Sequence, residues 1–327
     1  MKNIFNSLLI ISFTLVLYSC GGTSTTENSS EDISEKTLKT TEETININGV
    51  DHYIKKIGEG DPLLVLHGGP GLFHDYLIPH FEKLASKYQV IFYDQRGCGR
   101  TLFPSDTSSI TLSAYIEDLE AIRNHLEIEK LSLIGHSWGG ILAVSYGKKY
   151  PNNLEKLMLI SPGPATSAYY DETFNNMQGK RTDEDTKGLI QAMMSKEFED
   201  RDPTIFKKTV LLNDKVNLAK QETVEQLYSP VTFTKETANN LLLVSSMMEK
   251  NFFDYDLTIG IDAIKCPTIV IIGDLDNVPF LSAQMLTESL DNARLEVIKS
   301  ACHYPFFETP KEFNKIMFDF LDPEYQN

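Results

Sequence analysis

Short apolar runs alternate with stretches of helical periodicity through the first half of the chain. Four of these runs have the length of buried strands: residues 63–66, 90–93, 131–134 and 157–160. Apolar residues at helical spacing follow two of them, over residues 77–88 and 115–126. Because parallel neighbouring strands need crossover helices, this alternation predicts an α/β fold with a mostly parallel, doubly wound sheet.

The pattern changes after residue 163. Strand-like runs vanish, and charged helical stretches rich in Met and Phe continue to about residue 256. Strand-like runs then resume at residues 268–272 and 295–298. We therefore expect a helical cap inserted into one catalytic domain. The predicted boundaries are residues 164–256 for the cap, and residues 44–163 with 257–327 for the catalytic domain.

Two local signals lie near the ends of this domain. The dipeptide Asn48-Gly49 stands between two apolar-patterned segments and is typical of a hairpin turn. Near the other end, Thr309 is followed by Pro310 and Glu312, which is typical of a helix that begins with a capping box. The sheet should therefore begin with a hairpin, and the chain should end on a helix.

The N-terminus has the pattern of a targeting segment. An apolar run over residues 8–17 follows Lys2 and is too short to span a membrane comfortably. It ends near Cys20, and a segment rich in Ser, Thr and Glu follows. This is similar to a bacterial lipoprotein signal, with a signal peptide over residues 1–19, a lipidated Cys20 and a flexible tether over residues 20–43. It implies a lipid-anchored protein of the cell envelope, periplasmic or on the surface. A plain secretory signal is the alternative.

Charge and cysteine content exclude several classes of partner. The 327 residues include 30 Lys and Arg against 46 Asp and Glu, a formal net charge of −16. This acidity argues against nucleic acid and anionic membrane surfaces, so membrane contact should run through the N-terminal lipid only. The other cysteines are odd in number and lack metal-ligand spacing: Cys98, Cys266 and Cys302. We expect no metal and no cofactor, and the sequence does not indicate an oligomeric state.

The segment Gly135-His136-Ser137-Trp138-Gly139 joins a predicted strand to a predicted helix. A G-x-S-x-G turn in this context is expected to expose the serine as a nucleophile, and an ordinary glycine-rich turn between strand and helix is the alternative. The backbone N–H of Trp138 would then donate to a developing oxyanion. A second donor is expected from the loop after residues 63–66, where Gly69 is the natural candidate.

A serine nucleophile requires a base and an orienting carboxylate. Asp274 and Asp276 directly follow the strand predicted over residues 268–272, and His303 follows the next strand. The order Ser137, Asp, His is that of the α/β-hydrolase design, and strand ends converge at one edge of a parallel sheet. Spacing alone leaves both aspartates open.

Three motifs together resemble the proline iminopeptidase family of α/β-hydrolases. They are His67-Gly68-Gly69-Pro70-Gly71, Asp94-Gln95-Arg96-Gly97-Cys98-Gly99-Arg100 and Gly135-His136-Ser137-Trp138-Gly139-Gly140. The resemblance implies a serine aminopeptidase that releases N-terminal residues from short peptides through an acyl-enzyme, with proline as one candidate residue. Ser137 would be the nucleophile, His303 the base, and Gly69 and Trp138 the oxyanion hole. The family's G-x-x-D motif selects Asp276, although Pro279 follows it one residue early and keeps Asp274 as an alternative.

The resemblance also implies a site for the substrate's free amine. Family caps carry a glutamate in an Ile-Glu-Asn-like segment, which residues 248–253 resemble. Glu249 would bind the amine, and Phe252 and Phe253 would line an apolar slot. A solvated helix-end carboxylate is the alternative for Glu249.

Other functions remain compatible with the sequence. A second family glutamate follows a tryptophan in the cap, but Trp138 is this chain's only tryptophan, which favours a broader aminopeptidase. A carboxylesterase or amide hydrolase acting on a small acyl substrate would use the same triad. A non-catalytic ligand-binding lipoprotein on a hydrolase fold is the alternative of another class.

Overall fold

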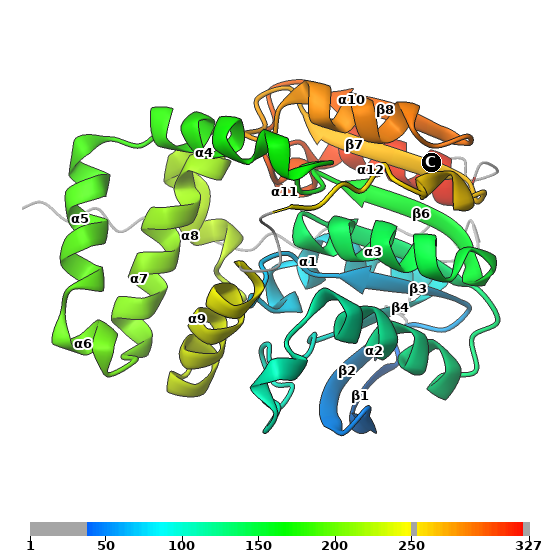
Figure 1. Ribbon diagram of the computed structural model, residues 1–327, viewed down its shortest axis with the longest axis horizontal. Coiled ribbons are helices and arrows are strands. Elements are labelled where there is room, and N and C mark those ends of the chain that lie inside the picture. The colour runs from blue at the N-terminus through cyan, green and yellow to red at the C-terminus, as the bar shows by residue number, and fades with distance from the viewer. Residues whose placement is uncertain (1–37, 250–253, 323–327) are drawn as a thin grey trace, which may run out of the picture. The chain divides into compact units, whose positions relative to one another are not determined.

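The computed structural model describes residues 38–249 and 254–322, which contain one eight-stranded sheet with helices packed against it (Figure 1). The strand order is β1-β2-β4-β3-β5-β6-β7-β8. β2 runs antiparallel to both of its neighbours, and all later pairings are parallel. The strands are β1 Thr40–Ile47, β2 Val50–Ile57, β3 Asp61–Leu66, β4 Tyr88–Tyr93, β5 Leu131–His136, β6 Leu154–Ile160, β7 Thr268–Gly273 and β8 Ala293–Ile298. The predicted α/β-hydrolase architecture, a mostly parallel doubly wound sheet, is confirmed.

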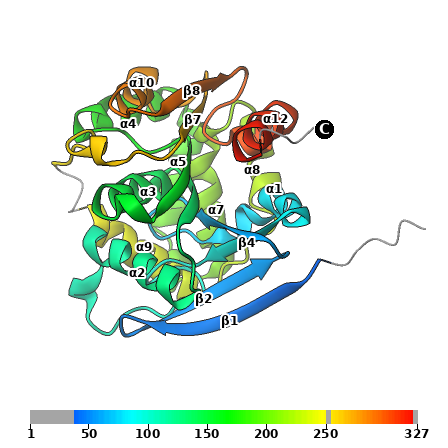
Figure 2. The same ribbon diagram turned by 90° about the vertical axis from the view of Figure 1, so that its right-hand side faces the viewer.

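Side chains of the central strands alternate between two hydrophobic clusters, one on each face of the sheet. Figure 2 shows helices on both sides of the sheet. On β3, Leu64 and Leu66 join the first cluster, whereas Leu63 and Val65 join the second. Helices α2 Leu112–His125, α3 Trp138–Lys149 and α10 Phe280–Glu288 cover the first face. Helices α1 Ile78–Phe81, α11 Pro305–Glu308 and α12 Pro310–Leu321 cover the second. Burial on both faces explains why these strands read as continuous apolar runs.

A group of helices lies beyond one end of the sheet (Figure 1). They are α4 Tyr170–Gly179, α5 Asp183–Met193, α6 Lys196–Glu199, α7 Pro203–Asp214, α8 Val224–Leu227 and α9 Lys235–Glu249. Side-chain oxygens of Thr182, Ser195 and Asp202 cap the starts of α5, α6 and α7. Among the residues described between 164 and 256 there is no strand, and an isolated bridge joins Thr166 to Asp256. We call α4 to α9 and their connections the helical insertion.

Helix α9 attaches this insertion to the sheet domain. Val244 and Met248 are fully buried in the first hydrophobic cluster. The hydroxyl of Ser245 donates to the carbonyl of Pro70 at 2.9 Å. Helix α9 therefore packs an apolar face, which includes Val244 and Met248, on the sheet domain.

The predicted hairpin is present, but its first strand begins earlier in the chain than expected. Asn48 and Gly49 have φ values of 49° and 78°, as a tight hairpin turn requires. However, β1 begins at Thr40, so the last four residues of the predicted tether belong to the sheet. Their side chains are mostly exposed and polar, because backbone pairing with β2 and ion pairs such as Lys55–Glu42 hold this edge without apolar burial.

Two predicted helical features are wrong in detail. The helix expected over residues 77–88 is replaced by α1 and a 3₁₀ turn, Glu82–Ser86, and Tyr88 instead pairs with Asp61 in the sheet. The predicted capping box is absent, because the Thr309 hydroxyl donates to the Pro305 carbonyl at 3.1 Å. That carbonyl lies in the short helix α11, which ends directly before Thr309.

No helix in residues 38–249 or 254–322 is long and apolar enough to cross a membrane. The three cysteines in these ranges carry free thiols, and no group of three or more metal-ligating side chains converges there.

Candidate active site

Ser137 stands at a sharp turn between β5 and α3. Its backbone has φ 53° and ψ −117°, a conformation that costs a residue with a side chain about 1–3 kcal/mol. The flanking glycines explain how the turn fits. A Cβ atom on Gly135 would lie 2.4 Å from the Gly139 carbonyl oxygen, and one on Gly139 would lie 2.4 Å from that of Leu66. The strand, strained turn and helix expected around this serine are all present.

His303 and Asp276 are hydrogen-bonded to each other. The Nδ1 atom of His303 lies 3.0 Å from Oδ1 and 3.2 Å from Oδ2 of Asp276. Burial alone would raise the pKa of Asp276, but the imidazole beside it and hydrogen bonds such as that from the Val278 N–H together hold that pKa below its ordinary value. Burial likewise opposes protonation of His303, yet Asp276 raises its pKa overall. With Nδ1–H donating to the carboxylate, Nε2 is the nitrogen left to accept a proton.

Asp274 has a different partner. Its Oδ1 accepts the backbone N–H of Ser300 at 2.7 Å, and its Oδ2 lies 3.5 Å from Lys299 Nζ. The geometry therefore brings Asp276, and not Asp274, to His303.

The loop after β3 lies against the serine. A Cβ atom on Gly68 would lie 3.3 Å from Cβ of Ser137. Gly69 has φ 130°, and a Cβ atom there would lie 2.7 Å from the backbone nitrogen of Gly71. The structure thus places the glycine-rich loop, with Gly69, next to the turn that contains Ser137 and Trp138.

Gln95 connects that loop to the turn. Its Nε2 donates to the carbonyl of His67 at 2.9 Å, and its Oε1 accepts the indole N–H of Trp138 at 2.7 Å. Its backbone N–H also donates to His67 Nε2 at 3.1 Å. The Asp94–Arg100 motif therefore has a structural basis, since its second residue ties the two predicted oxyanion-hole segments together.

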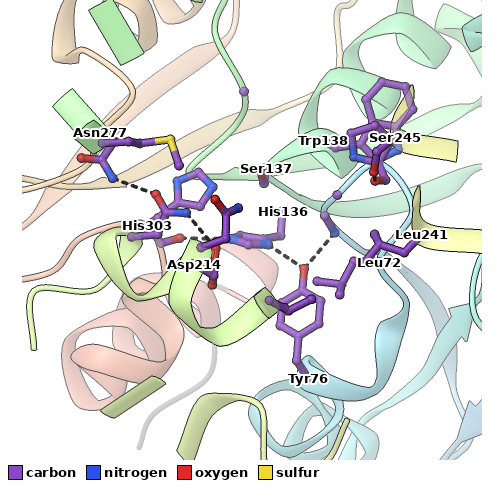
Figure 3. Close-up of a pocket in the computed structure, with 18 of the residues that line it drawn as sticks. Leu72, Tyr76, His136, Ser137, Trp138, Asp214, Leu241, Ser245, Asn277 and His303 are labelled. Carbon is purple, nitrogen blue, oxygen red and sulfur yellow. Dashed lines mark hydrogen bonds between the residues drawn. The ribbon is translucent and has the colours of Figure 1, made fainter. Parts of the chain in front are cut away.

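Ser137 and His303 share a cavity of about 770 Å³ that the helical insertion helps to enclose (Figure 3). Side chains from α4 to α9 contribute much of its apolar wall, including Met177, Leu189, Met193, Phe206, Val210 and Leu241. In the close-up, His303 and Asp214 lie on one side of Ser137, and Leu241 and Ser245 lie on the other. A cavity of this size accommodates a drug-sized molecule rather than a single small side chain.

Asp214, at the end of α7, is a carboxylate in the wall of this cavity. Its Oδ2 accepts hydrogen bonds from the hydroxyls of Tyr228 at 3.0 Å and Tyr304 at 2.7 Å. Its Oδ1 accepts the amide of Asn217 at 2.7 Å. These three partners are uncharged donors that stabilise an ionised carboxylate without neutralising it.

Several predicted site residues cannot be compared with the structure. Cys20, Phe252 and Phe253 lie outside the described residues, as does the side chain of Glu249. The sequence interpretation missed Asp214, because one aspartate among many in a charged helical region carries no local motif. It also missed Tyr76, whose hydroxyl accepts the Gly68 N–H at 2.8 Å.

Comparison with known proteins identifies the family of the chain. The family model of the alpha/beta hydrolase fold matches residues 61–310. A proline iminopeptidase of Saccharolobus solfataricus is 31% identical over 301 residues, covering 85% of this chain and 91% of the relative. The chain belongs to the proline iminopeptidase family of α/β-hydrolases.

Solved structures extend the similarity in fold. A proline iminopeptidase of Mycobacterium smegmatis superposes with a TM-score of 0.62 and 22% identity, over 86% of this chain and 98% of that one. An esterase of Exiguobacterium antarcticum superposes with a TM-score of 0.63 and 21% identity, over 85% and 98%. At these identities the solved structures show a shared fold, and the family membership stated above makes the protein a hydrolase of the α/β class.

Proposed function

We propose that this protein is a serine hydrolase that releases N-terminal residues from short peptides through an acyl-enzyme. The observation that carries the proposal is that Ser137, on a strained turn, lines the same cavity as His303, which is hydrogen-bonded to Asp276. These are the residue types, strand-end positions and chain order of a serine nucleophile, its base and the orienting acid.

In the proposed reaction, Nε2 of His303 accepts the hydroxyl proton as Oγ of Ser137 attacks the scissile carbonyl. The resulting oxyanion accepts hydrogen bonds from the backbone N–H groups of Gly69 and Trp138. The protonated His303 then returns its proton to the leaving amine, and the peptide bond breaks. A water molecule, activated by the same histidine, hydrolyses the acyl-enzyme and restores Ser137.

The proposed substrate carries a free α-ammonium group. A cation bound in a largely apolar cavity must be paired with a carboxylate, because an unpaired buried charge is costly. Asp214 is such a carboxylate in the described cavity wall, and its bonded partners are neutral. Glu249 remains the second candidate from the family resemblance.

The test is a rate panel on the purified mature protein. Prolyl, alanyl and leucyl arylamides are compared with their N-acetylated forms and with simple acyl esters. An aminopeptidase cleaves the free-amine arylamides and rejects the acetylated ones. An esterase or amide hydrolase shows no such preference, which would remove the proposed substrate class.

A second measurement tests the serine mechanism separately. An alkyl fluorophosphonate should label wild type but neither Ser137→Ala nor His303→Ala, and turnover of both variants should fall by about 10⁴-fold or more. Turnover within tenfold of wild type in folded Ser137→Ala protein would reject the serine mechanism. An unlabelled wild type without turnover would favour a ligand-binding protein.

We also propose that Cys20 carries a lipid that anchors the protein in the cell envelope. The proposal rests on the apolar run and the polar segment on either side of this residue.

A further inference from the structure

We infer that Glu308 is a positioning residue that fixes the loop carrying His303 and joins it to the helical insertion. Its Oε2 accepts the backbone N–H groups of Cys302 at 2.8 Å and Tyr304 at 3.3 Å, the two neighbours of His303. Its Oε1 accepts the backbone N–H of Ala219, in the insertion, at 2.6 Å. The inference rests on the proposed use of His303 as the base, but not on the identity of the substrate.

Other contacts hold the backbone of His303 itself. Its N–H donates to the carbonyl of Asn217 at 3.0 Å, and its carbonyl accepts from Nε2 of His136 at 3.0 Å. Asn217 and Ala219 both belong to the connection between α7 and α8. Glu308 therefore completes a set of contacts in which one short stretch of the insertion supports the loop of the proposed base.

The three N–H donors around Glu308 require an acceptor at both oxygens. A glutamine of the same length would place its NH₂ group against at least one of these backbone N–H groups. Partial burial raises the pKa of Glu308, and the three amide hydrogen bonds offset part of that rise. The carboxylate of Glu308 can therefore accept all three backbone N–H groups, whereas the side-chain amide of a glutamine cannot.

The charge of Glu308 also acts on His303. Burial is the largest influence on the His303 pKa and lowers it, while the carboxylates of Asp276, Asp214 and Glu308 raise it. The ring of His136 lies 5.2 Å from that of His303, and burial keeps the pKa of His136 at about 3, so this neighbour is neutral. Removing the charge of Glu308 should therefore lower the pKa of His303.

Two substitutions distinguish the effect of the Glu308 charge from the effect of its side-chain length. Glu308→Gln keeps the length and removes the charge, whereas Glu308→Asp keeps the charge and shortens the side chain by one methylene. Glu312→Gln is the matched control, because Glu312 is exposed on α12 four residues further on. For each protein, kcat and KM are measured from pH 5 to 9 on the best substrate, together with the rate of labelling by an alkyl fluorophosphonate. Circular dichroism confirms folding.

Glu308→Gln should lower kcat by about 10- to 100-fold with little change in KM, since a misplaced base costs rate rather than binding. Its labelling rate should fall in parallel, and the acidic limb of kcat should move to lower pH. Glu308→Asp should lower both rates without moving that limb, and Glu312→Gln should match wild type.

Labelling and kcat of Glu308→Gln within twofold of wild type, with the limb unmoved, would overturn the inference. A Glu308→Gln variant with a raised KM and an unchanged kcat would also overturn the inference. If Glu308→Gln does not fold, the same rate criteria apply to Glu308→Asp. Failure of the proposed serine mechanism is distinguishable, because wild type itself would then resist the fluorophosphonate.

Discussion

His136, the residue before the proposed nucleophile, donates its Nε2–H to the backbone carbonyl of His303 at 3.0 Å. Its Nδ1 accepts from the hydroxyl of Tyr76 at 2.7 Å, and that hydroxyl accepts the N–H of Gly68. One chain of hydrogen bonds therefore runs from the glycine-rich loop through His136 to the loop of the proposed base. Since burial lowers the pKa of His136 to about 3, this ring is neutral and can act as donor and acceptor at once.

Removing this ring should affect rate and stability together. His136→Phe leaves the Tyr76 hydroxyl and the His303 carbonyl without their partner, which costs about 1–3 kcal/mol for each unsatisfied buried group. We expect a lower free energy of unfolding in urea and a lower kcat. Tyr76→Phe is the control, because it keeps the bond from His136 to His303. Equal kcat in wild type and His136→Phe would show that this bond does not position the base.

Acid should lower the free energy of unfolding already between about pH 6.5 and 4, because buried histidines resist protonation in this range. Burial lowers the pKa of His67 and His80 to about 4 and that of His136 to about 3, so the folded protein keeps these rings neutral. The unfolded chain protonates them near pH 6.5. Their contribution is present above that pH and is lost as the pH falls toward 4, at up to about 1.4 kcal/mol per pH unit for each ring.

Urea unfolding at pH 7, 6, 5 and 4 measures this loss. His80→Gln is the informative variant, because it removes one titrating ring and leaves His136, in the turn beside Ser137, unchanged. The His80 ring packs against Phe306 and Phe307. Its stability should fall less steeply with acid than that of wild type. Identical slopes would show that His80 is not held neutral in the folded protein.

The two aspartates after β7 should differ sharply. Asp276→Asn removes the negative charge and puts an NH₂ group in place of one carboxylate oxygen, which favours the wrong tautomer of His303, so kcat should fall by about 10⁴-fold. Asp274→Asn affects only the contacts to the Ser300 N–H and to Lys299, neither of which involves His303, and it should stay within about tenfold of wild type. Steady-state kinetics on one substrate compare them, and the opposite ranking would transfer the orienting role to Asp274.

Asp214 should discriminate between substrates. Asp214→Asn keeps the shape and removes the charge, so the loss in kcat/KM should fall on arylamides with a free amine. A change of about 10²-fold or more is expected when a buried charge pair is broken. Acyl esters without an amine should change much less. An equal loss on both substrate types would make Asp214 structural.

The proposed anchor predicts detergent partitioning of the mature protein. Cys20→Ser should release the protein into the aqueous phase, because the lipid is attached through the cysteine sulfur. Mass spectrometry of the mature N-terminus checks the modification directly. An unmodified start at another residue would reject lipidation.

Elements with strong local signals were predictable from the sequence. The turn at Ser137 has glycines on both sides and an apolar run before it, so local sterics and burial already specify strand, bend and helix. The hairpin at Asn48-Gly49 is similar, because both positions require positive φ. His303 could be chosen from chain order and strand ends alone.

Features set by tertiary partners were not predictable. Thr309 has the local sequence of a cap, but its hydroxyl bonds to the carbonyl left by the preceding short helix. Spacing left Asp276 and Asp274 both open, and only the family resemblance selected Asp276; the folded loop brings that carboxylate to His303. Asp214 lies 89 residues before His303 in the chain, and no pattern in the helical region indicates that the two share a cavity.

The contact between Asn217 and His303 has a consequence for engineering. Exchanging the helical region between family members is an obvious way to graft a new selectivity onto this scaffold. Here such a graft would also replace the segment whose backbone carbonyl, at Asn217, accepts the His303 N–H, and a different backbone path there would misplace that acceptor. Chimeras that retain the native connection from Asp214 to Ala219 should keep their turnover. Chimeras that replace this connection would lose turnover together with the original substrate selectivity. A screen for activity on new substrates would then reject them as inactive.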